Sequence, residues 1–264
     1  MRRPFIAAVF TLAVLLMPPL TAAPGLAQQG QLPALKPPPP APIKPYQPVA
    51  VTPPAPFADP GFVTFRKQLA DVAAHKDRAA LAKLIVAKGF FWIQDKDLAD
   101  QQKSGVDNLA RAIALDAKDG PGWEAVAGFA NEPSAAELPQ QKGVFCGPAD
   151  PTIDPQAFEA LGKATQTDSS EWAYPVKAGV EVHTAAQGSA PISEKLGVNL
   201  VRILPDSGED ADPNQPFFLH VATPSGKSGF VDAQSLSPLG GDQMCYAKDA
   251  NGWKVAGYFG GVAP

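Results

Sequence analysis

The sequence predicts an α+β protein with its helices and strands in separate modules: a helical domain, then a small all-β domain that ends in an extra hairpin. Three observations predict this. Apolar residues recur at three- and four-residue steps over residues 61–165. After Trp172 they alternate with polar residues. Near the carboxy terminus, Asn251-Gly252 stands between two further strand-like runs, which is a strong hairpin signal.

The first 27 residues have the features of a cleavable signal peptide. Arg2 and Arg3 precede an apolar run over residues 5–17, and Gly25-Leu26-Ala27 provides a small-x-small cleavage site. The alternative is a retained membrane anchor, but the run is shorter than the ~20 apolar residues that cross a bilayer. We expect cleavage before Gln28, a periplasmic or secreted location, and no stable membrane insertion of the mature chain.

Residues 28–60 are dominated by proline, with four consecutive prolines at 37–40. Such a segment buries too little apolar surface to offset its ordering entropy, and proline favours an extended form of ~3.1 Å per residue. We interpret the segment as a disordered linker that acts as a tether. The alternative is a proline-rich ligand for the aromatic groove of a partner domain.

The predicted helical domain covers residues 61–165. Asp59 followed by Pro60 is typical of a helix start, with a capping acceptor and proline in the first turn. The apolar stripe of this first helix comprises Phe62, Phe65, Leu69, Val72 and Ala73. Further helical patterns follow Asp77 and cover parts of residues 106–129 and 155–164. We expect the aromatic run at residues 90–93 to be core, with a ligand pocket as the alternative.

The predicted β domain covers residues 172–264. The strand-like residues at its start are Val176, Ala178, Val180 and Val182. Further runs lie at residues 200–204, 217–223 and 228–231, and a long acidic loop at 205–216 separates the first two. Several short strands with turn residues between them imply a small barrel or sandwich.

Two segments of this domain resemble bacterial SH3-like (SH3b) domains. Residues 179–197 are similar to their opening strand and loop, and Gly226-Lys-Ser-Gly229-Phe230-Val231 is similar to their closing Gly-x-x-Gly-Trp-Val signature. The sequence departs from the family at Ala185 and Ala186, where arginine and proline are usual, and at Phe230, where tryptophan is common.

The resemblance covers residues 176–240 and implies an SH3-like barrel with Phe230 and Val231 packed inside. It also implies a targeting or binding role, often toward peptidoglycan. The whole arrangement resembles, in addition, a class of uncharacterised proteobacterial periplasmic proteins, which implies no mechanism.

Cys146 and Cys245 are the two cysteines of the chain. In an oxidising compartment an isolated pair predicts one disulfide, and the alternatives are two buried free thiols or one reactive thiol. A nucleophilic Cys146 would need a histidine close by. Residues 145–148 have the composition of a turn rather than a helix start, so no helix dipole is expected to lower the thiol pKa.

The rest of the sequence contains no recognisable catalytic or metal-binding motif. His75, His183 and His220 are far apart and lack the spacing of zinc ligands. Neither a Gly-x-Ser-x-Gly elbow nor a phosphate-binding glycine loop is present. The net charge of −4, without a basic block after the leader, argues against nucleic acid as a partner. We expect no cofactor and no metal.

These observations predict a non-catalytic cell-envelope module whose SH3-like barrel binds a peptidoglycan component or an envelope protein. The candidate binding residues are the aromatic side chains Tyr174, Phe217 and Tyr246, together with the loop at 205–216. Two alternatives remain open: a cell-wall hydrolase with Cys146 as nucleophile, and a purely structural envelope scaffold.

Overall fold

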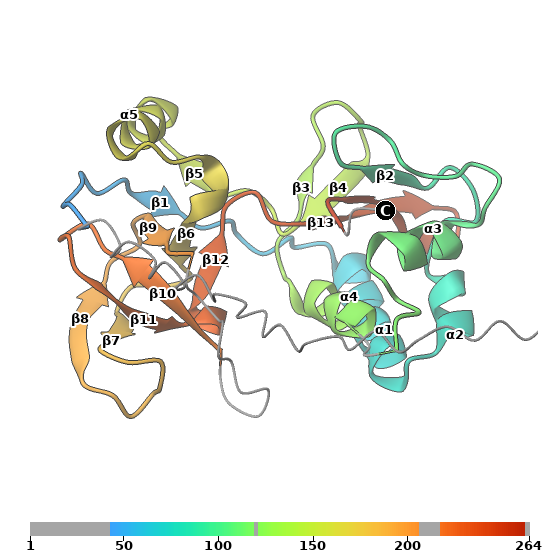
Figure 1. Ribbon diagram of the computed structural model, residues 1–264. Coiled ribbons are helices and arrows are strands. Elements are labelled where there is room, and N and C mark those ends of the chain that lie inside the picture. Colours follow the sequence, from blue (N-terminus) through green and yellow to red (C-terminus); the bar gives the residue numbers. More distant parts are fainter. Residues whose placement is uncertain (1–42, 119–120, 206–216, 262–264) are drawn as a thin grey trace, which may run out of the picture. The chain divides into compact units, whose positions relative to one another are not determined.

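The computed structural model describes residues 43–118, 121–205 and 217–261 (Figure 1). The predicted signal peptide, the first part of the predicted linker and nearly all of the 205–216 loop lie outside the described residues. Within them the chain forms five α-helices and fourteen β-strands, and the strands make three sheets.

The prediction of a helical domain followed by a closed SH3-like barrel is wrong. Sheet rather than helix predominates, and strands also occur within the region predicted to be helical. The largest sheet has the order β12-β6-β9-β10-β11-β7-β8, and no pairing between described residues joins its edge strands β12 and β8. A barrel requires such a closing pair. Alternation along each strand predicts the strands themselves but carries no information about whether the two edges meet.

One half of the fold, which we call the five-stranded lobe, combines a sheet with four helices (Figure 1). In sheet order its strands are β2 (Phe91–Ile93), β14 (Gly252–Phe259), β13 (Gln243–Asp249), β4 (Val144–Gly147) and β3 (Ala136–Glu137). Its helices are α1 (Pro60–His75), α2 (Arg78–Lys83), α3 (Gly105–Ala112) and α4 (Pro121–Asn131). The strand pairs are antiparallel except for β14 with β2, which is parallel.

Helix α1 begins where the sequence predicts. The Asp59 side chain accepts a hydrogen bond from the main-chain N–H of Phe62 at 2.7 Å, and Pro60 occupies the first turn. The buried residues of the helix, which confirm the predicted stripe, are Phe62, Phe65, Leu69 and Ala73. The rings of Phe62 and Phe65 pack against Tyr246 of β13, with centroids 4.9 and 5.9 Å apart. The helix therefore covers the terminal hairpin.

The terminal hairpin, β13 and β14, lies in the five-stranded lobe rather than with the other strands of the predicted β domain. The hairpin forms where the sequence predicts it, but its two-residue turn lies one position earlier than Asn251-Gly252, because Asp249 pairs with Gly252 across residues 250–251. However, β13 pairs with β4 and β14 pairs with β2. A lone hairpin is at best marginally stable in water. Here the side chains of Met244 and Val255 are buried in the core of the five-stranded lobe.

The other half, the seven-stranded lobe, contains the largest sheet, with antiparallel neighbours throughout. In sheet order its strands are β12 (Leu236–Pro238), β6 (Trp172–Pro175), β9 (Val201–Ile203), β10 (Phe218–Ala222), β11 (Ser228–Asp232), β7 (Val180–His183) and β8 (Ile192–Leu196). It also contains a two-stranded sheet, β1 (Val51–Thr52) with β5 (Thr152–Ile153), helix α5 (Pro155–Thr165), and two short 3₁₀ segments, Ser169–Glu171 and Ala233–Ser235.

Residues 43–52, which we expected to belong to the linker, pack on the seven-stranded lobe. The Tyr46 hydroxyl lies 3.1 Å from the carbonyl oxygen of Leu200 and 3.0 Å from that of Ala222. Val49 and Val51 are buried in a cluster that includes Trp172. The high proline content obscured these three apolar side chains, which supply the buried surface that a linker lacks.

Candidate binding surface

One face of the seven-stranded sheet packs in the core of the lobe. The opposite face, which we call the outer face, is covered at β6, where Trp172 and Tyr174 are buried in a cluster with Val49 and Val51. Alternate side chains of a strand point to opposite faces. On the core face lie the fully buried valines Val182, Val221 and Val231. Their sequence neighbours His183, His220 and Phe230 therefore point to the outer face.

The outer face carries a cluster of four rings, of which His183 and Phe218 are buried, each 8% exposed, whereas His220 and Phe230 are partly exposed. His183 pairs with Phe230 in the strand register, and Phe230 pairs with His220, so the three side chains form one row across β7, β11 and β10. The rings of His220 and Phe230 are stacked, with centroids 4.7 Å apart and planes inclined by 14°. The His183 ring meets Phe218 edge to face at 5.9 Å. We call His183, Phe218, His220 and Phe230 the ring cluster.

The main chain fixes His183 in place. Its Nδ1 lies 2.9 Å from the carbonyl oxygen of Ala190 in the loop between β7 and β8. On the neighbouring strand stands Gly229, where an added Cβ would lie 2.7 Å from the His183 carbonyl oxygen and 2.5 Å from Val182 Cγ1. Glycine therefore permits the close approach of β11 to β7 that brings Phe230 beside His183.

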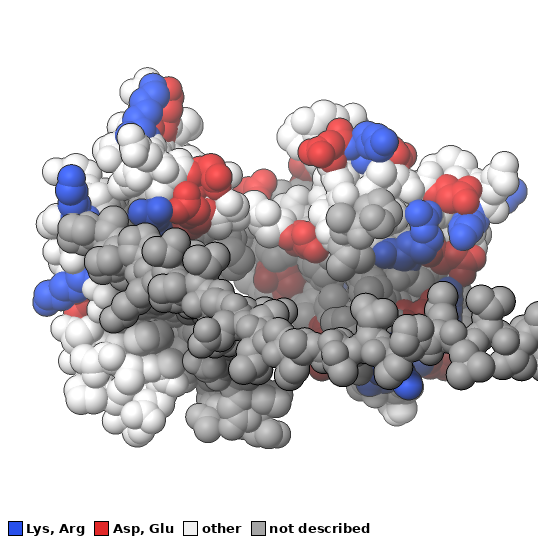
Figure 2. Space-filling model, viewed as in Figure 1, with Lys and Arg blue, Asp and Glu red and all other residues white. Residues whose placement is uncertain are grey.

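The segment next to the ring cluster is uncharged. Residues 182–193, which form the end of β7, the following loop and the start of β8, contain no Asp, Glu, Lys or Arg. Figure 2 shows white surface over this loop, at the lower left. Two large apolar side chains stand out toward solvent on β8 and just before β10: Ile192 is 47% exposed and Phe217 is 42% exposed. Two cations of the same sheet are already paired: Arg202 Nη2 lies 2.6 Å from Glu171 Oε2, and Lys195 Nζ lies 3.0 Å from Glu181 Oε1.

This arrangement suits an uncharged ligand with flat or apolar faces. Rings offer stacking surfaces, and imidazole adds hydrogen-bond donors and acceptors. A phosphate-rich ligand would need several lysines or arginines at the same place, and the uncharged segment does not supply them.

The three aromatic candidates from the sequence occupy different environments. Tyr246 is 2% exposed and Tyr174 is 4% exposed, and burial raises the pKa of both hydroxyls. Neither side chain is at the surface. Phe217 is at the surface and directly precedes the ring cluster. The 206–216 part of the candidate loop lies outside the described residues.

The sequence analysis missed His183, His220 and Phe230 as a group. It expected Phe230 to pack inside a barrel together with Val231. Adjacent residues of a strand point to opposite faces, so the complete burial of Val231 places Phe230 on the outer side. The signal was available in the sequence, because each of the three residues adjoins a strand valine: His183 follows Val182, while His220 and Phe230 precede Val221 and Val231.

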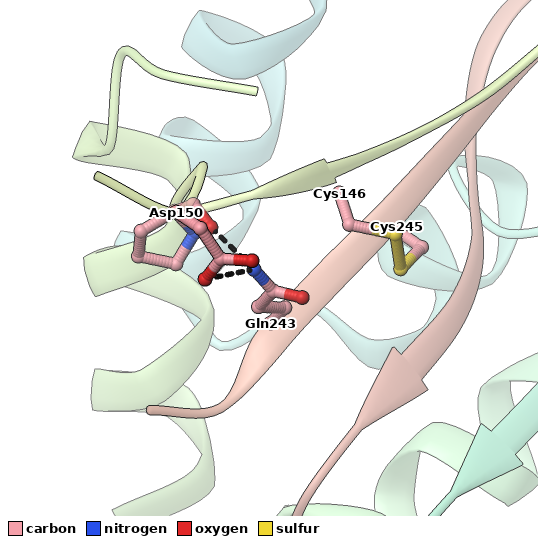
Figure 3. Close-up of a disulfide and its surroundings, with 5 residues drawn as sticks. Cys146, Asp150, Gln243 and Cys245 are labelled. Carbon is pink, nitrogen blue, oxygen red and sulfur yellow. Dashed lines mark hydrogen bonds between the residues drawn. A yellow bond between two sulfur atoms is a disulfide. The ribbon is translucent and has the colours of Figure 1, made fainter. Parts of the chain in front are cut away.

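The predicted disulfide is present. Cys146 of β4 and Cys245 of β13 face each other in the strand register and are bonded, with an Sγ–Sγ distance of 2.01 Å (Figure 3). Beside it the Gln243 side chain donates a hydrogen bond to the Pro148 carbonyl oxygen at 2.7 Å. In this bonded form Cys146 has no thiolate to act as a nucleophile.

The described residues contain no cluster of three or more His, Cys, Asp or Glu side chains placed to hold a metal ion. His75 is exposed at the end of α1, whereas the other two histidines lie in the ring cluster. In the part of the chain that the structure describes, no helix is long and apolar enough to cross a membrane.

No family model matches the chain, and neither a curated protein nor a solved structure matches it. The resemblance to bacterial SH3 domains therefore stays a prediction from the residues of two segments.

Proposed function

We propose that this chain is a non-catalytic protein of the bacterial cell envelope and that the outer face of its seven-stranded sheet binds the glycan part of peptidoglycan. The observation that carries the proposal is the ring cluster, which places four rings from three neighbouring strands beside an uncharged loop. Sugars present flat apolar faces, and stacked rings can contact them.

The location of the protein supports this ligand. The amino-terminal sequence has the pattern of an export signal, and the disulfide is of a kind that persists in oxidising compartments such as the periplasm. In our proposal the leader is removed before Gln28, and proline-rich residues precede the folded part of the mature chain.

Co-sedimentation with purified peptidoglycan sacculi tests the proposal. We expect the chain from Gln28 to pellet with sacculi at both moderate and high salt, because the contacts are not between charges. Phe230→Leu, which keeps an apolar side chain and removes the ring, and His220→Ala should each reduce the pelleted fraction severalfold. His75→Ala removes a histidine from the other lobe and should pellet like the unmodified chain.

Circular dichroism and thermal melts establish that each variant is folded. If the folded variants of the ring cluster pellet as well as the unmodified chain, the proposed surface is wrong. If no form pellets, glycan binding is wrong, and pull-down of an envelope protein by the same surface becomes the next experiment.

A further inference from the structure

A groove in the five-stranded lobe lies between the start of α2, helix α3 and the turn after α3. It has a volume of about 430 Å³ and is open to solvent. Its charged lining residues are Arg78, Lys103, Asp107, Arg111 and Asp116, and its remaining lining consists of three alanines. Figure 2 shows positive and negative side chains close together over this part of the lobe. We propose that the groove binds the free carboxylate end of a short peptide with small apolar side chains.

The two carboxylates of the groove already have partners. Arg78 Nη2 lies 2.8 Å from Asp107 Oδ1, and Arg78 Nε lies 3.7 Å from Asp116 Oδ1. Asp107 also accepts a hydrogen bond from the Ser104 hydroxyl at 2.6 Å, at the start of α3. Arg78 is thus engaged in holding α2 to α3 and to the turn beyond it.

Lys103 and Arg111 differ from Arg78, because no carboxylate among the described residues lies within ion-pair distance of either side chain. The Arg111 guanidinium lies over the Trp92 ring, 5.4 Å from its centroid. Trp92 is held by a hydrogen bond from its Nε1 to the Gly260 carbonyl oxygen at 2.8 Å. A guanidinium has a planar fork of N–H donors that suits a bidentate carboxylate.

The net charge of the groove favours a ligand with a single negative charge. Three cations and two carboxylates give the lining a net charge of +1, whereas the whole chain carries −4. The groove therefore favours an anion on a protein that otherwise repels anions. A phosphate dianion would meet Asp107 and Asp116 with only one net positive charge to offset it, so a single carboxylate fits better.

The apolar part of the lining selects the rest of the ligand. Ala110, Ala114 and Ala117 present methyl groups beside the two cations. The volume is near the lower end of the range found for small-molecule sites. Together these features suit a residue or two with methyl-sized side chains that ends in a free carboxylate.

Titration with N-acetyl-alanyl-alanine, followed by amide chemical shifts in two-dimensional NMR of the chain from Gln28, tests the inference. We expect saturable shifts in α3 with a dissociation constant of about millimolar, as a ligand of this size usually reaches. The matched probe N-acetyl-alanyl-alanine amide has the same shape without the charge and should bind at least about tenfold more weakly. The two probes are compared on one unmodified protein, so this result does not depend on the folding of a variant.

Arg111→Gln removes the exposed guanidinium and should weaken the acid probe about tenfold or more. Lys67→Gln removes an exposed positive charge of α1 outside the groove and should leave the affinity within about twofold. Equal binding of acid and amide, unchanged affinity in Arg111→Gln, or no saturable shift up to about 20 mM would each overturn the inference. The groove and the ring cluster lie in different lobes, so this outcome and the sacculus experiment are independent.

Discussion

The disulfide has the largest stability effect that the structure allows us to work out. Cys146 and Cys245 are separated by 99 positions in sequence, and residues 147–244 between them contain β5, α5 and all of β6 to β12. In the chain-entropy account, closing a loop of about 100 residues lowers the entropy of the unfolded state enough to stabilise the fold by about 4.7 kcal/mol at 25 °C. For a folded part of this size, that corresponds to a fall in Tm of about 10–20 °C on removal of the bond.

The perturbation is the double substitution Cys146→Ala and Cys245→Ala, with the reduced unmodified chain as control. Both cysteines are buried, so the alanine pair also loses the packing of two sulfurs, whereas reduction leaves them in place. Urea unfolding at pH 7 should show a free energy of unfolding about 4–5 kcal/mol lower for the reduced chain, and lower again for the alanine pair. A loss below about 1 kcal/mol in both forms would refute the entropic reasoning.

Three further predictions concern single sites. In α4, Gly128→Ala should stabilise the fold by up to about 1 kcal/mol, because an added Cβ meets nothing within 4 Å. Gly122→Ala in the same helix should instead destabilise it by about 1–3 kcal/mol, because its Cβ would lie 2.5 Å from a main-chain atom of the preceding turn; urea unfolding measures both. Tyr46→Phe should cost about 0.5–1.5 kcal/mol through the hydroxyl bonds to two main-chain carbonyls, and an unchanged urea midpoint would contradict this. Hydrogen bonds hold the pKa of Asp59 and Asp107 below the ordinary 3.8, chiefly from a main-chain N–H to Asp59 and from a serine hydroxyl to Asp107. The stability that these two carboxylates contribute is complete above the unfolded-state pKa of 3.8 and is lost as pH falls through the lower folded-state pKa. Thermal melts below about pH 4 should therefore show a falling Tm, and Asp59→Asn and Asp107→Asn should each make that fall smaller.

Local structure was predictable where neighbouring residues alone determine it. Asp59 and Pro60 begin α1 because a capping carboxylate and a proline satisfy the first turn without any distant contact. The hairpin at Asn251-Gly252 was likewise predictable from these two residues, although its turn is at 250–251. The cysteine pair was predictable for a different reason, because a chain with only two cysteines has one possible intramolecular pairing.

The assignment of elements to sheets was not predictable, because it depends on which apolar faces meet. The terminal hairpin follows β12 in sequence but is covered by α1 and pairs with β2 and β4. The parallel pairing of β14 with β2 joins residues about 165 positions apart, such as Tyr258 and Trp92. A period of two gives each strand an inner and an outer face, yet it does not identify the partner strand.

Aromatic content was a poor guide to the binding surface, because two of the three aromatic candidates are buried. Packing accounts for Tyr246 in the core of the five-stranded lobe and for Tyr174 in the cluster with Trp172 and Val49. His220 and Phe230 stand one position out of phase with buried valines. Two half-buried rings on the outer face of a sheet contribute less to stability through apolar burial than the same rings would in the core. The sacculus experiment examines whether a ligand contacts those rings from the outer face.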